Sequence, residues 1–327
     1  MEAKADNRRF DQQNGMTMVE LLVALAIGSF LIIGAVQIYN QSRQAFIINE
    51  SIARVQETAQ FAMDTIEADL RLASNWGLNS RALAVEGRSL PGEDNPLGLP
   101  APATCGAVWA LDLASPIEGD NNAYGLPCAA EGGIQANSDV ITSRRATTAP
   151  VTPQAGRLQI QSTRIQGQLF ADGTVPAGFS AADSRTHNLL VNSYYVAQSS
   201  NLIPGVPTLR RKTLSGGAGG PTIVDQEVAP GVENIQLQLG IDVDQDNTVD
   251  RYVNPGDPIM DPTDAAFIPG ARAMTARIWV VVRGVNPEFG IQDDASYQPG
   301  DVDLGSFDDA FRRLQVSKTI LLRNARS

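Results

Sequence analysis

The sequence predicts an α+β fold in which one long N-terminal helix packs on an antiparallel β-sheet with long loops. Up to about residue 72, apolar residues recur at steps of three and four, which is the period of a helix. Further along, several segments alternate apolar and polar residues, which is the period of a half-buried strand. One helix followed by a run of strands favours an α+β arrangement over alternating βαβ units.

The first element is an uncharged, largely apolar run between Glu20 and Arg43. Its length is enough to span a bilayer core as a helix. No small-residue cleavage site of a secretory signal follows it, and three basic residues precede it, so the upstream flank is expected to stay cytoplasmic. Glu20 places a carboxylate at the edge of this run, where a charge is costly and usually marks a functional site.

The second element continues the helix with one apolar face. This face comprises Ile48, Ile52, Val55, Ala59, Met63, Ile66 and Leu70. One helix is therefore expected from about Met16 to Leu72, ended by the turn residues 74–79. A free-standing coiled coil is the alternative, but the pattern lasts too few heptads to favour it.

The rest of the chain is expected to form a β-rich head. Residues 80–153 are rich in Gly, Pro, Ala and Asn, which indicates long loops. Residues 215–220 and 286–306 are expected to be exposed connections. The expected strands lie at residues 158–160, 190–196, 207–214, 235–243, 274–282 and 314–322. Of these, 190–196 and 207–214 are expected to pair as a hairpin.

Charge is unevenly distributed along the 327-residue chain, whose net charge is −11. Between Asp242 and Asp309 there are 14 acidic residues against four Arg, so most of the imbalance lies in the last third. No basic stripe of the kind that phosphate backbones require is present, so nucleic-acid binding is disfavoured. The basic run 210–212 is interpreted as a solvated strand edge.

The two cysteines, Cys105 and Cys128, lie in the loop-rich region. If the head lies outside the cytoplasm, they most simply form a disulfide that contributes roughly 3 kcal/mol by the chain-entropy argument. Two free buried thiols are the alternative. A zinc site would need two more ligands, and His187, the one histidine of the sequence, supplies at most one.

An acidic loop reads DVDQDNTVD and places Asp242, Asp244, Asp246 and Asp250 at positions one, three, five and nine of a calcium-type pattern. Position six is Asn247 rather than Gly, and the bidentate glutamate of an EF-hand is missing at position twelve. Two interpretations stay open: a possible Ca²⁺ site, and a solvated acidic hairpin loop.

Enzymatic motifs are missing from the sequence. It contains no G-x-S-x-G elbow, no P-loop and no H-E-x-x-H, and His187 at the start of an expected strand is interpreted as structural. The expectation is therefore a protein that is not an enzyme. A membrane-tethered periplasmic enzyme or binding module is kept as the alternative from another class.

Residues 15–34 read GMTMVELLVALAIGSFLIIG. This combination of Gly, Thr, Glu and an apolar run at fixed offsets resembles the class III signal of type IV pilins and type II secretion pseudopilins. The resemblance implies that a prepilin peptidase cleaves between Gly15 and Met16 and methylates the new amine. It also implies that Glu20 pairs with the Met16 amine of a neighbouring subunit during assembly. The implied parts are a leader (1–15), a transmembrane and assembly helix (16–40), an amphipathic helix (41–73) and a periplasmic β-rich head (74–327).

The order of elements further resembles minor pilins of the PilW type and, more distantly, GspJ-type pseudopilins. The matching pieces are residues 56–77, 239–252 and 311–324. This resemblance implies a pilin-like lollipop that primes or caps a type IV pilus; a type II secretion pseudopilin is the alternative. The implied partners are other minor pilins, the major pilin, prepilin peptidase, the inner-membrane assembly platform and membrane lipid. The implied location is the inner membrane, crossed once with the head in the periplasm, and then the pilus.

Overall fold

The computed structural model describes residues 15–89, 94–106, 108–261, 264–288 and 290–326. Of the expected leader, all but Gly15 lies outside the described residues. The chain divides into two compact units, Met1–Ile52 and Ala53–Ser327, and each is described by itself.

The helix α1 (Met18–Arg71) is continuous and begins in the first unit. From Met18 to Phe46 its large apolar side chains are exposed to solvent; Leu22, for example, is 66% exposed. The helix is long enough and apolar enough to cross a membrane. The predicted N-terminal helix is thus confirmed, and its apolar surface has to be covered by lipid or by other protein.

The second unit contains the last part of α1, and here one face is buried. Val55, Ala59, Met63, Ile66 and Leu70 are at most 4% exposed, which confirms the predicted amphipathic face. Ile48, at the start of the predicted face, belongs to the first unit and is 38% exposed. The helix ends just before Ser74, which adopts a positive φ of 64°.

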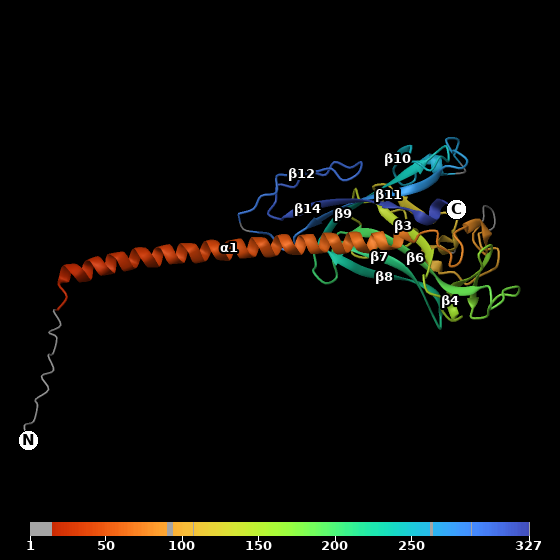
Figure 1. Cartoon of the computed structure of the whole chain (residues 1–327), viewed down its shortest axis with the longest axis horizontal. Coiled ribbons are helices and arrows are strands. Elements are labelled where there is room, and N and C mark those ends of the chain that lie inside the picture. Colours follow the sequence, from red (N-terminus) through yellow and green to blue (C-terminus); the bar gives the residue numbers. More distant parts are fainter. Residues whose placement is uncertain (1–14, 90–93, 107, 262–263, 289, 327) are drawn as a thin grey trace, which may run out of the picture. The chain divides into compact units, whose positions relative to one another are not determined.

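Two sheets make up most of the second unit (Figure 1). The larger has the order β1-β5-β4-β6-β3-β2, with β7 beside β6 and β8 beside β7. Its strands are β1 (Val85–Glu86), β2 (Ile117–Asp120), β3 (Val140–Ala146), β4 (Ala155–Ser162), β5 (Gly167–Asp172), β6 (Arg185–Ala197), β7 (Thr208–Gly217) and β8 (Gly220–Pro230).

The smaller sheet has the order β10-β9-β11-β14. Its strands are β9 (Val232–Asp242), β10 (Arg251–Val253), β11 (Arg272–Arg283) and β14 (Arg313–Leu321). A two-stranded ribbon joins β12 (Ser296–Tyr297) to β13 (Gly305–Ser306). Short 3₁₀ helices lie at Ala82–Ala84, Ala103–Cys105, Trp109–Leu111, Pro258–Met260 and Arg323–Arg326.

The main core joins α1 to both sheets. The buried face of α1 packs with Ile141, Tyr194 and Leu209 of the larger sheet and with apolar residues of the smaller one. These partners in the smaller sheet are Ile235, Leu237, Ile278, Val280 and Ile320. The predicted α+β class with one helix packed on mostly antiparallel strands is confirmed.

The strand predictions are largely confirmed, with differences in detail. The hairpin of β6 and β7 forms as expected. The strands form two sheets rather than one, β1 pairs with β5 in parallel, and β8 is a strand that the sequence did not indicate. The predicted exposed connection 286–306 contains buried Asp293 and Tyr297.

The interpretation of residues 210–212 as a solvated strand edge is wrong for two of the three. Arg210 and Lys212 are 1% and 4% exposed, because β7 lies between β6 and β8 and both side chains pair with Asp225 of β8. Each cation is thus neutralised by Asp225, which lies on a strand that the sequence did not indicate.

Asp69 ties α1 to the larger sheet through a buried polar cluster. Its Oδ1 accepts hydrogen bonds from Arg145 at 2.7 and 2.9 Å. Its Oδ2 accepts from Asn192 and from the hydroxyl of Tyr194, both at 2.6 Å. Asp69 is only 4% exposed, so its carboxylate is satisfied by these side-chain donors rather than by water.

Replacing Asp69 by Asn should lower the free energy of unfolding by about 2 kcal/mol. The amide keeps the shape but turns one acceptor into a donor, so one buried donor loses its partner. Urea unfolding followed by tryptophan fluorescence measures the change. Asp64→Asn is the control, because Asp64 is exposed and its ion pair spans 3.9 Å. An equal change in both variants would contradict the anchoring role of Asp69.

The predicted disulfide between Cys105 and Cys128 is confirmed. It closes a segment that contributes Trp109, Leu111 and Leu113 to a second core cluster, beside the larger sheet. The cross-link therefore holds a loop-rich cover in place over buried apolar side chains.

The double change Cys105→Ser with Cys128→Ser should lower the free energy of unfolding by about 3 kcal/mol, because the unfolded chain regains the freedom of the 23-residue separation. The urea midpoint should fall, and the slope of the transition should rise somewhat, because the unfolded chain without the cross-link is less compact. An unchanged midpoint would show that core packing alone holds the loop.

Candidate functional site

The N-terminus of α1 is closed by a reciprocal pair of side chains. The backbone N–H and the hydroxyl of Thr17 donate to Glu20 Oε2 at 2.9 and 3.0 Å. In return, the backbone N–H of Glu20 donates to Thr17 Oγ1 at 3.3 Å. This is a capping box, which satisfies donors that the first turn of a helix leaves without partners.

Sequence reasoning used Thr17 as part of the signal motif but missed its role as the cap of the helix. The signal was available, because T-M-V-E fits the S/T-x-x-E pattern directly before an apolar run. The consequence is local: Glu20 has partners within its own chain, so a neighbouring amine would join an existing arrangement rather than meet a bare carboxylate.

Gly15 and Met16 lie just before the helix, outside any helix or strand. Met16 is 66% exposed, and a Cβ built on Gly15 would meet no atom within 4 Å. The bond between them is thus uncovered in the chain itself. Cleavage there would leave a new amine directly before Thr17, next to the capping box.

The acidic loop follows β9 and brings three of its four predicted ligands together. Oxygen atoms of Asp242, Asp244 and Asp250 lie within 4.8 Å of one another. Asp246 is turned to another partner, since its Oδ1 accepts from the backbone and the hydroxyl of Thr248 at 2.7 and 2.6 Å. Asn247 adopts the positive φ expected at position six, 70°.

Asp242 already has a cationic partner. Its Oδ2 accepts from Arg272 Nη2 at 3.0 Å and from the backbone N–H of Asn247, while Oδ1 accepts from the backbone N–H of Gln245 at 2.7 Å. Although burial opposes ionisation, these hydrogen bonds with Arg272, Asn247 and Gln245 lower the pKa of Asp242. A Ca²⁺ ion would therefore compete with Arg272 for one of its three carboxylates.

His187 is buried in β6, and its Nδ1 lies 2.7 Å from the carbonyl oxygen of Thr147. With a 2% exposed ring held by the backbone of a neighbouring segment, it has the position of a core residue. The interpretation of His187 as structural fits this placement.

Comparison with known protein families gives two matches within the chain. Residues 11–36 match the prokaryotic N-terminal methylation motif, so the chain carries the class III signal of type IV pilin-like proteins. Residues 193–324 match type IV pilus-assembly protein W, and this part of the head is a PilW-type pilus-assembly domain. Such proteins are structural, and both matches imply pilin partners and processing of the N-terminal signal.

A solved structure of a type IV-like pilin from Thermus thermophilus is 14% identical in sequence. The match covers 58% of this chain and 80% of that one, with a TM-score of 0.28. No curated protein matches this chain.

Proposed function

We propose that this protein is a minor pilin that primes or caps a type IV pilus. In this proposal it is inserted in the inner membrane with its head in the periplasm. After cleavage between Gly15 and Met16 it joins the fibre, together with other minor pilins and the major pilin. The membrane assembly platform and prepilin peptidase are its remaining partners.

The observation that carries the proposal is the arrangement at the start of α1. An acid, Glu20, lies in the first turn of a helix whose following side chains are apolar and exposed. A charge at such a place is tolerable when it is paired, and cleavage would create a cationic partner on each neighbouring subunit. The PilW-type domain supports a pilus rather than a secretion pseudopilus as the destination.

The intact mass of chain extracted from native membranes tests the processing step. The expected species lacks residues 1–15 and carries one added methyl group. A Gly15→Val variant should keep its leader and stay out of fibres. Functional protein that retains its first fifteen residues would overturn the proposal.

Deletion of pilus genes or of secretion genes separates the two related functions. We expect the chain to be lost from sheared surface fibres when the pilus assembly platform is removed, and to be unaffected when a type II secretion platform is removed. The opposite dependence would identify a pseudopilin. If the chain is found neither in pili nor in secretion pseudopili, a membrane-tethered periplasmic enzyme or binding module would be favoured.

We also propose that Asp242, Asp244 and Asp250 bind Ca²⁺ weakly. The convergence of their oxygens supports binding, and the competing Arg272 explains why it should be weak. In calorimetric titration, Arg272→Gln should bind Ca²⁺ more tightly than the unsubstituted chain, and Asp244→Asn more weakly. If neither the unsubstituted chain nor either variant gives a heat of Ca²⁺ binding, the metal site is refuted. The loop is then an acidic loop held by its own hydrogen bonds.

A further inference from the structure

Asp139, the residue directly before β3, is a buried acid whose charge is not balanced. It is 1% exposed. Its Oδ1 accepts from the backbone N–H of Asn122 at 2.8 Å, and its Oδ2 accepts from the backbone N–H of Leu237 at 2.7 Å. Both donors are neutral, so the two hydrogen bonds orient the carboxylate but supply no opposite charge.

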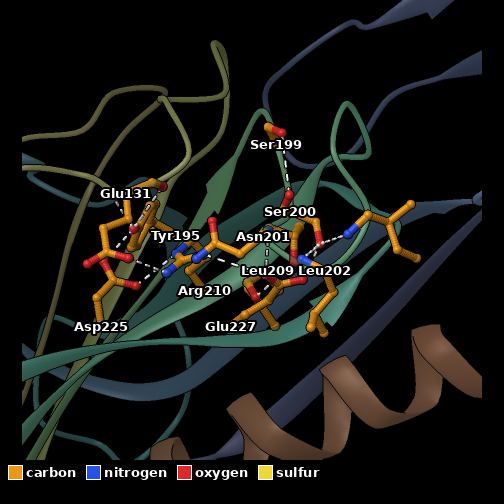
Figure 2. A network of polar contacts seen from close by, with 12 residues as sticks. Glu131, Tyr195, Ser199, Ser200, Asn201, Leu202, Leu209, Arg210, Asp225 and Glu227 are labelled. Atoms are coloured by element: carbon orange, nitrogen blue, oxygen red, sulfur yellow. Dashed lines mark hydrogen bonds and ion pairs between the residues drawn. The ribbon is translucent and has the colours of Figure 1, made fainter.

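The other acids that are buried in the described part of the head each have a cation beside them. The ion pairs are Asp69 with Arg145, Glu233 with Arg313, Asp242 with Arg272, and Asp293 with Arg313. Figure 2 shows a further case, in which the carboxylate of Asp225 lies beside Arg210 at 2.8 Å. Asp139 forms no ion pair with any described residue. It is therefore the exception to the rule that buried charges are paired.

The surroundings of Asp139 add negative charge rather than positive. Burial, with smaller contributions from the charges of Asp301 and Asp120, raises the pKa of Asp139 to about 7, although the two backbone N–H groups oppose this shift. A positive charge placed near these carboxylates would favour their ionised forms. The described side chains do not supply that charge to Asp139.

Asp301, in the loop between β12 and β13, is surrounded by side-chain amides. Its Oδ2 accepts from the Nδ2 atoms of Asn121, Asn122 and Asn254 at 3.1, 3.3 and 2.6 Å. Asn122 also connects Asp301 to Asp139, because it bonds Asp139 through its backbone N–H. The cluster thus brings together the loop after β2, the residue before β3, the residue after β10 and the loop after β12.

Two amide oxygens of this cluster are buried and have no hydrogen-bond partner among the described residues. They are Asn121 Oδ1 and Gln236 Oε1. Gln236 of β9 is 0% exposed, and its Nε2 donates to Asn122 Oδ1 at 3.2 Å. Its Oε1 is directed at the loop of Asp301, since a Cβ built on the preceding Gly300 would lie 3.5 Å from this oxygen. Buried acceptors of this kind are normally satisfied, so each points to a bound group.

We propose that this cluster binds a Ca²⁺ ion. We call it the inter-sheet site, defined by Asn121, Asn122, Asp139, Gln236, Asn254 and Asp301. The carboxylate of Asp301 and the amide oxygens are ligands, and Asp139 supplies the buried negative charge. Carboxylate and amide oxygens are the ligands that Ca²⁺ prefers in proteins.

The spacing of the side chains around Asp301 fits a shared ion. Oxygens that each bind one Ca²⁺ at about 2.4 Å lie about 3 Å apart. The three amide nitrogens that contact Asp301 lie at this spacing from its Oδ2, between 2.6 and 3.3 Å. Rotation of an Asn amide about its last side-chain bond exchanges the nitrogen with the oxygen. Each amide can therefore turn its oxygen to the ion without displacing the backbone.

A proton on Asp139 and a bound water molecule are the competing explanations. A proton would remove the charge of Asp139 but would leave the oxygens of Asn121 and Gln236 without donors. A water molecule would donate to these oxygens but would bring no positive charge. A cation accounts for both observations. It would also join the larger sheet to the smaller sheet and to the ribbon of β12 and β13.

Urea unfolding of the full chain in detergent, with Ca²⁺ or with a chelator, tests the site. Every chain in the comparison carries Asp244→Asn, which weakens the acidic loop after β9 as a second place for the ion. The test variant adds Asp301→Asn, a change at an exposed residue that should leave the fold intact. The control adds Asp303→Asn, because Asp303 is exposed, lies in the same loop and loses the same charge.

Ca²⁺ should raise the urea midpoint of the Asp244→Asn chain and, to the same extent, that of the Asp303→Asn control, because it binds the folded state. The Asp301→Asn chain should need at least about 10-fold more Ca²⁺ for the same shift, because a charged ligand is lost. A midpoint that does not respond to Ca²⁺ would show that no ion binds. Equal responses of the Asp301→Asn and Asp303→Asn chains would place the ion elsewhere, and either result would overturn the proposal. None of these outcomes depends on Glu20 or on cleavage, so failure here leaves the pilin proposal standing.

Discussion

Replacing Glu20 by Ala should give a chain that is inserted, cleaved and folded but absent from fibres. In hydrocarbon, the amine of the next subunit would then meet no carboxylate, and an unpaired buried charge costs about 3–5 kcal/mol. This corresponds to a loss of incorporation of about 100-fold or more. The amount of the chain in sheared fibres, relative to the amount in membranes, measures the effect.

Two variants separate pairing between subunits from capping within one chain. If Glu20 served only the capping box, Thr17→Ala would reproduce the defect, because it removes the hydroxyl that donates to Glu20 and accepts from its backbone. We expect Thr17→Ala to retain most incorporation. Glu57→Ala, on an exposed position of the same helix, should behave as the unsubstituted chain. Normal incorporation of the Glu20→Ala chain would refute the pairing.

Replacing Arg313 by Met should lower the free energy of unfolding by about 3–5 kcal/mol, because three carboxylates would lose a shared buried cation. The side chain of Arg313 is 1% exposed. It contacts Glu233 of β9 at 2.6 Å, Asp293 at 3.2 Å and Asp309 at 2.6 Å. It thereby joins the first residues of β14 to β9 and to the segment that carries β12.

The control for Arg313 is Arg71→Met, since Arg71 is half exposed and pairs within one helix, where the loss should stay below about 0.5 kcal/mol. Arg313→Lys keeps the charge without the paired hydrogen bonds and should give an intermediate loss if Arg313→Met does not fold. Urea unfolding of the full chain in detergent provides the comparison. Similar losses for Arg313→Met and Arg71→Met would contradict the role of the cluster.

The cluster around Arg313 also makes the stability of the fold depend on pH. Its hydrogen bonds with Arg313 lower the pKa of Asp309 below its usual value. A lowered folded pKa means that this group contributes stability above a pH of about 4, and that the contribution is lost as the pH falls through the folded value. In the Arg313→Met variant, this part of the acid sensitivity should be smaller.

Local sequence patterns were sufficient to predict two kinds of element. These are a helix face whose apolar residues recur periodically and strands that pair with a neighbouring segment of the chain. The face of Val55, Ala59 and Leu70 is a periodic signal, and the β6 and β7 hairpin joins neighbouring segments. The strand β8 was missed because residues 220–230 begin with Gly and Pro and show no sustained alternation of large apolar residues.

The roles of single polar residues could not be predicted from the sequence, because their partners lie far away along the chain. Asp69 resembles the neighbouring acids of α1, and its role appears only when Arg145 and Tyr194 are brought to it from β3 and β6. Lys212 was interpreted as solvated because Asp225 was not known to lie opposite it. Thr17 differs from these, since its partner is three residues away and the pattern was present in the sequence.

The attachment of α1 to the second unit also determines how that unit carries mechanical load. One face of the helix is buried from Val55 to Leu70, over about 24 Å, and Asp69 is bonded near the far end of this stretch. A pull along the helix axis is therefore shared by all these contacts at once, in shear, instead of peeling them apart one turn at a time. Resistance to traction is thus built into the same helix that carries the N-terminal signal.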